Sequence, residues 1–194
     1  MTARLRTLAL AAAVGLTVAA CNVTAPTNVR FNTYTVSGES LGALNRELAL
    51  HGPLIPGRGR ALASADINFA PNVLLEYRGG ECRVATAEFR VDAEVTLPEW
   101  RQTDRASPEL AAVWEAFSAE ALQHELTHVR IAEEHARAME RAVRRLSAGD
   151  CPTVEAEIRR TIDRIAAEHS AAQTDFDRRE AERFARVARA ARVR

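Results

Sequence analysis

The stretch His124-Glu125-Leu126-Thr127-His128 restricts what this chain can fold into more than any other. On a helix, residues four apart lie one above the other, separated by about 6 Å of rise, so both imidazoles can reach one cation. Glu125 would project from nearly the same side. This is the HExxH arrangement, in which two histidines hold zinc and the glutamate acts as a general base on water. The alternative is a chance match within an ordinary helix.

The hydrophobic pattern around the motif predicts a long helix. It begins at Ser107-Pro108-Glu109, where a capping hydroxyl precedes a proline in the first turn, and Gly149 and Pro152 mark its end. Three- and four-residue spacing places the histidines on one stripe with apolar residues: Leu110, Trp114, Phe117, Ala121, His124, His128, Ile131 and His135. A second long helix has the apolar face Ile158, Ile162, Ile165, His169, Ala172 and Phe176. We expect the two helices to pack as an antiparallel hairpin.

The chain before the long helices is expected to form a small sheet. Segment 31–36 alternates strand-forming residues, and a short helix over 41–48 follows it. Segments 61–77 and 82–97 are strand-like and are joined by Arg78-Gly79-Gly80-Glu81, which is typical of a hairpin turn. The sequence therefore predicts an α+β fold. A small antiparallel or mixed sheet of about three or four strands would pack on two long helices, the first carrying HExxH.

The first residues are typical of an export signal. Arg4 and Arg6 precede an apolar stretch over 8–18 that is too short to span a bilayer. Val18-Ala19-Ala20-Cys21 matches a lipoprotein cleavage box, so the mature chain would begin at a lipid-modified Cys21. We expect a lipoprotein signal peptide over 1–20, a tether over 21–29 and a single domain over 30–194, exported to a bacterial cell envelope. The alternative is a plain secretory signal whose cleavage site happens to include a cysteine.

Cys82 and Cys151 are the two cysteines that remain if Cys21 carries lipid. In an oxidising envelope compartment, an even pair far apart in sequence favours a disulfide over two free thiols. Such a bridge would join the segment before the HExxH helix to the segment after it. Two buried free thiols are the alternative.

The charge balance and the length are typical of a globular domain without a nucleic-acid partner. The 26 basic residues, all arginine, balance 26 acidic ones, so nothing in the composition indicates a nucleic-acid partner. The 194 residues are enough for one domain with a sizeable core.

The chain also resembles a known family. The residues that carry the resemblance are Tyr34-x-Val36-x-Gly38, Gly52-Pro53, Cys82-Arg83-Val84, Leu97-Pro98-x-Trp100, Trp114, the HExxH stretch and Cys151. In order and spacing they resemble the bacterial family of uncharacterised domains described as predicted secreted zinc-dependent proteases. The resemblance implies a zincin-like metallopeptidase fold. It also implies an edge strand beside the active-site helix that could hold an extended peptide.

A catalytic zinc site needs a third protein ligand from outside the HExxH turn. Where the family closes with a Tyr-Asp-x-x-Thr-x-His-Gly pattern, this chain has segment 176–183, and the family histidine falls on Glu182. The resemblance therefore implies Glu182 as the third ligand. His169 is the alternative, because hairpin register brings it near His128, and Asp177 is expected to orient an imidazole. His135 lies about 10 Å along the axis from His128 and is expected to be a core histidine.

These observations together predict a lipid-anchored zinc peptidase. His124, His128 and Glu182 would hold the zinc ion, and Glu125 would serve as general base in the hydrolysis of a peptide or protein substrate. The membrane would be a second partner through the lipid anchor. A different class remains open, in which the chain is a non-catalytic envelope lipoprotein that keeps the fold and binds a partner. Hydrolysis of another amide, such as one in the cell wall, would use the same site.

Overall fold

The computed structural model describes residues 25–191, and their side chains through residue 183. The predicted signal peptide and the predicted lipidation site Cys21 lie outside the described residues. The elements, in order, are β1 (Thr27–Val36), α1 (Leu41–His51), β2 (Leu54–Ile55), β3 (Gly59–Arg60), β4 (Ser64–Arg78), β5 (Glu81–Trp100), the 3-10 helix η1 (Thr103–Arg105), α2 (Pro108–Val143), β6 (Ser147–Ala148) and α3 (Cys151–Ala191). The predicted α+β class is confirmed.

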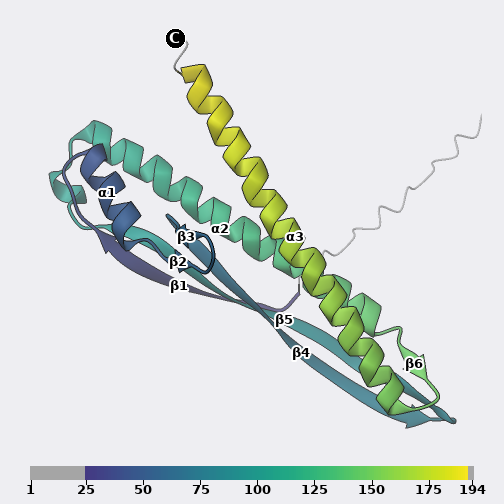
Figure 1. Cartoon of the computed structure of the whole chain (residues 1–194). Coiled ribbons are helices and arrows are strands. Elements are labelled where there is room, and N and C mark those ends of the chain that lie inside the picture. Colours follow the sequence, from purple (N-terminus) through teal and green to yellow (C-terminus); the bar gives the residue numbers. More distant parts are fainter. Residues whose placement is uncertain (1–24, 192–194) are drawn as a thin grey trace, which may run out of the picture.

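The main sheet is mixed and is built around β5 (Figure 1). Strand β4 pairs with one side of β5 in antiparallel fashion, and β1 pairs with the other side in parallel, from Thr27 opposite Val91 to Val36 opposite Trp100. The short strand β6 pairs with β5 beside Cys82. Strands β2 and β3 form a separate two-stranded ribbon. The far side of β4 is therefore an edge of the main sheet.

Burial along β5 alternates because one face of the sheet packs on helices and the other meets solvent. Cys82 and Val84 are buried, and after a shift of phase Ala87, Phe89 and Val91 are buried in turn. The shift has a cause in the register, because Leu74 pairs with Thr86 and Leu75 with Val84, which leaves Ala85 as the extra residue of a bulge.

The predicted hairpin turn joins β4 to β5. Gly79 and Gly80 have φ angles of 67° and 84°, a backbone conformation that favours glycine at both positions. Local sequence therefore determines where this hairpin reverses.

The two long helices form the predicted antiparallel pair (Figure 1). Along the pair, His135 of α2 contacts His169 of α3, His128 contacts Gln173, and His124 contacts Asp177. The two helices are therefore antiparallel, because later residues of α3 contact earlier residues of α2. The Ser107 hydroxyl accepts from the Leu110 amide and caps α2, as its sequence predicts.

The buried stripe of α2 lies beside the histidine stripe that we predicted to pack with the core. Its buried residues are Glu125, Val129, Ala132, Ala136, Met139 and Val143. All five apolar residues among them share core clusters with β5. The stripe that carries His124 and His128 is only half-buried. The two stripes differ because one side of α2 packs on the sheet and the neighbouring side packs on α3.

A smaller apolar cluster surrounds α1, where Val36, Leu44, Leu48 and Trp100 are buried. The indole Nε1 of Trp100 donates a hydrogen bond to the Gly38 carbonyl at 2.9 Å. Trp114 of α2 packs against Trp100 with ring centroids 5.6 Å apart. The two tryptophans and Gly38 therefore join β5, α2 and the segment between β1 and α1.

The predicted Cys82–Cys151 disulfide is present, with Cα atoms 5.1 Å apart. It links the start of β5 to the first residue of α3 across 69 positions of sequence. The tether predicted over 21–29 overlaps the fold, because Ala25 is buried and Thr27 already pairs with Val91. Within the described part of the chain, no helix carries an apolar stretch long enough to cross a membrane.

Candidate metal centre

The HExxH stretch lies in the interior of α2, where regular helical geometry fixes the spacing of its side chains. The Nε2 atoms of His124 and His128 are 3.1 Å apart. Burial, followed by the neighbouring His128, lowers the pKa of His124. The neutral imidazole that this favours is the form that binds a cation.

Asp177 of α3 completes a triangle of donor atoms. Its Oδ1 lies 3.3 Å from Nε2 of His124 and 3.0 Å from Nε2 of His128. Two ligands of tetrahedral zinc, each bonded at about 2.0–2.1 Å, are about 3.3–3.4 Å apart, so the triangle fits that ion. Among the described residues, these three form the one group of His, Cys, Asp or Glu side chains that converges in this way.

The second oxygen of Asp177 has its own partner. Nη1 of Arg58, in the turn between β2 and β3, donates to Oδ2 at 2.6 Å. The two oxygens of the carboxylate therefore have different partners. The guanidinium binds Oδ2, and Oδ1 faces both imidazoles. A carboxylate held in this way would bind a metal through one oxygen.

Phe176 lies against both imidazoles. Its ring centroid is 4.8 Å from that of His124 and 5.0 Å from that of His128. An apolar neighbour on this side limits the access of water to the rings and restricts their rotation.

Gln173 and His169, both on α3, lie on the Nδ1 side of His128, away from the triangle of donor atoms. Oε1 of Gln173 is 2.5 Å from Nδ1 of His128, and Nε2 of Gln173 is 2.7 Å from Nε2 of His169. Burial, and then the neighbouring His135 and His128, lower the pKa of His169 to about 4. The His169 imidazole is therefore neutral near pH 7 and can accept a hydrogen bond from the amide.

Glu125 is only 5% exposed although it is an acid. Burial raises its pKa to about 7, and the negative charge of Asp177 adds to the rise. A carboxyl group with a pKa near 7 can both accept and return a proton at neutral pH.

The three donor atoms lie in a cleft between the two long helices and the start of β4. The cleft has a volume of about 520 Å³, and Glu125 and His169 also line it. A more apolar recess of about 670 Å³ adjoins it and shares Ala61, Ala63, His124 and Glu125. Leu62, Ala116, Phe117 and Ala121 supply most of the remaining apolar lining.

Segment 61–63, which borders both hollows, is held in place by residues of the family pattern. The Tyr34 hydroxyl donates to the Leu62 carbonyl at 2.7 Å. Gly52 lies so close to this segment that a Cβ on it would be 2.0 Å from the Ala61 carbonyl oxygen. A glycine is therefore required there, which is a structural reason for Gly52-Pro53.

The structure brings His124 and His128 together as predicted, and it places Glu182 elsewhere. The Glu182 side chain is exposed and accepts from Nη1 of Arg178 at 2.8 Å. Five residues beyond Asp177 on a helix correspond to a rotation of about 140°, which turns Glu182 away from the histidines. His169, the alternative, contacts Gln173 and lies outside the triangle.

His135 has the structural role that we expected. Its Nδ1 is 2.7 Å from the Ile131 carbonyl of its own helix, and its ring packs against His169. It does not contribute to the triangle of donor atoms.

The sequence alone predicts only an orienting role for Asp177 and no role for Gln173 or Arg58. A signal existed for the first two, because His169, Gln173 and Asp177 follow one another at four-residue steps and so share one face of α3. No local pattern marks Arg58, which reaches Asp177 from 119 positions away.

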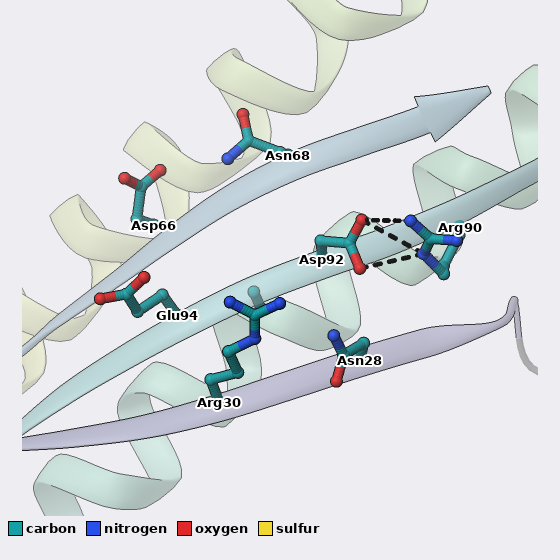
Figure 2. Close-up of a pocket in the computed structure, with 8 residues that line it drawn as sticks. Asn28, Arg30, Asp66, Asn68, Arg90, Asp92 and Glu94 are labelled. Carbon is teal, nitrogen blue, oxygen red and sulfur yellow. Dashed lines mark hydrogen bonds and ion pairs between the residues drawn. The ribbon is translucent and has the colours of Figure 1, made fainter.

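A separate hollow of about 590 Å³ lies on the outer face of the sheet (Figure 2). Its polar lining consists of Asn28, Arg30, Asp66, Asn68, Arg90, Asp92 and Glu94. Arg90 forms an ion pair with Asp92 at 2.9 Å, and their hydrogen bond lowers the pKa of Asp92. Arg90, Asp92 and Glu94 alternate with the buried residues of β5, as expected for a solvated sheet face.

Residues 31–184 match the sequence pattern of the family described as "Bacterial protein of unknown function (DUF922)". No curated protein and no solved structure matches the chain. The match includes β1, the HExxH stretch and the part of α3 that carries Asp177.

Proposed function

We propose that this chain, which belongs to the DUF922 family of bacterial proteins, is a zinc-dependent peptidase. The observation that carries the proposal is the triangle of donor atoms of His124, His128 and Asp177, with sides of 3.0 to 3.3 Å, beside the buried Glu125. Two imidazoles and one carboxylate are a ligand set typical of catalytic zinc, and three protein ligands leave a fourth position free.

Each residue has a definite part in this chemistry. A zinc ion held by the triangle would polarise an amide carbonyl and acidify water. Glu125 accepts a proton from the water that adds to the carbonyl carbon. It then gives a proton to the nitrogen as the C–N bond breaks, so that a carboxylic acid and an amine result. The pKa of about 7 suits Glu125 to both steps.

The shape of the cleft supports an extended peptide as the substrate. It lies beside the start of β4, which is an edge strand and can pair with an added chain. Glu125 lines both the cleft and the apolar recess. A substrate side chain next to the scissile bond would therefore enter the recess. We therefore propose peptides with an apolar residue at that position.

The disulfide supports export from the cytosol, because such bonds persist in oxidising compartments. We retain the proposal of a bacterial envelope lipoprotein that is held on a membrane through lipid at Cys21. This fits a peptidase that acts on peptides or proteins of the envelope.

The decisive experiment compares the purified protein with its Glu125→Gln variant. Both should bind one zinc ion and unfold at similar temperatures, whereas the variant should lose peptide hydrolysis by several orders of magnitude. Glu134→Gln, an exposed position on the same helix, is the matched control and should keep full activity. Equal hydrolysis by wild type and Glu125→Gln would reject the proposal. Zinc binding without hydrolysis of any amide would favour the partner-binding alternative.

A further inference from the structure

The orientation of the Gln173 amide is determined by its backbone contact. Its Nε2 donates to the carbonyl oxygen of His128 at 3.0 Å and also lies 2.7 Å from Nε2 of His169. A flipped amide would place its oxygen against that carbonyl, bringing two acceptors together. The amide oxygen therefore faces His128.

This orientation determines where the His128 ring carries its proton. Oε1 of Gln173 is 2.5 Å from Nδ1 of His128, and an amide oxygen can only accept. Nδ1 must therefore carry the hydrogen. In the neutral ring Nε2 is then unprotonated, and Nε2 is the atom that faces His124 and Asp177.

We infer that Gln173 is a positioning residue that holds His128 in the Nδ1-protonated tautomer and so presents its Nε2 lone pair to a metal ion. His169 supports Gln173 by accepting the second amide hydrogen. The role toward zinc rests on the proposed function, whereas the hydrogen on Nδ1 follows from the Gln173 contact and does not require the ion. Removal of a side chain that hydrogen-bonds to a metal-binding histidine typically lowers metal affinity about 10–100-fold.

The test replaces Gln173 in the full chain in two ways. Gln173→Met keeps the length of the side chain and removes both hydrogen-bonding groups, and Gln173→Glu keeps an acceptor for Nδ1 and removes the donor. Gln123→Met is the matched control, because Gln123 is exposed on α2. Nitrogen NMR of histidine-labelled, metal-free protein reports the tautomer of His128, and competition with a chelator measures zinc affinity.

We expect the wild type, Gln123→Met and Gln173→Glu to carry the His128 hydrogen on Nδ1. Gln173→Met should shift it toward Nε2 and weaken zinc binding about 10–100-fold. Gln173→Glu keeps the acceptor for Nδ1 but sets an oxygen against the His128 carbonyl, so it should weaken zinc binding less than Gln173→Met does. A wild-type His128 that carries its hydrogen on Nε2 and none on Nδ1 would overturn the inference, even if the Met variant does not fold. An unchanged tautomer and affinity in a folded Gln173→Met protein would also overturn it. Failure of the wild type to bind zinc would instead reject the proposed function.

Discussion

At the scale of single residues, the choice of third ligand decides whether the site can hold zinc. Asp177 points one oxygen at both imidazoles, and Glu182 pairs with Arg178 in solvent. We therefore expect Asp177→Ala to lower zinc affinity by more than the factor of about 10–100 typical of outer contacts. Glu182→Ala should change it less than about twofold, within the small effect of an exposed ion pair. Metal titration of the three proteins measures both effects, and a larger loss from Glu182→Ala would restore the sequence-based assignment.

At the scale of elements, the segment over 61–63 and the N-terminal half of α2 form the apolar recess. Ala121→Phe should fill part of it, with zinc binding unchanged. The preference for a leucine over an alanine peptide next to the scissile bond should then fall, because one or more buried methylenes are worth about 10–200-fold in kcat/KM.

Ala119→Phe provides the matched control for the recess, since Ala119 is exposed on the same helix and is not part of the recess. The measurement is the ratio of kcat/KM for the two peptides in each variant. A preference that survives in Ala121→Phe and equals that of the control would show that the recess does not receive the side chain.

At the scale of the whole molecule, the Cys82–Cys151 bridge closes a loop that contains most of β5, all of α2 and the HExxH stretch. Replacing both cysteines with serine should lower the free energy of unfolding by about 2–5 kcal/mol, since the unfolded chain gains freedom. Chemical denaturation measures this loss, and a reduced wild type should behave like the double variant. Equal stability of all three proteins would mean that the bridge does not constrain the unfolded chain.

Features that depend on neighbours in the chain were predictable from the sequence. The four-residue spacing on a helix places His124 beside His128. The pair Ser107-Pro108 marks the start of α2, and Gly79-Gly80 forms the turn between β4 and β5. Each is a matter of backbone conformation over a few residues, where steric limits and local hydrogen bonds decide. For the disulfide, the cysteine count favoured the pair Cys82–Cys151 on the premise that Cys21 carries lipid, and the structure contains that bridge.

Which residues from other elements reach the histidines depends on how the helices and the sheet pack. A change of one residue in the register of α3 rotates its face by about 100°, so Asp177, Glu182 and His169 could not be separated by counting. The parallel pairing of β1 with β5 and the reach of Arg58 to Asp177 join segments more than 50 positions apart. Such contacts depend on how the apolar faces of α2, α3 and the sheet pack together, and no local pattern records that packing.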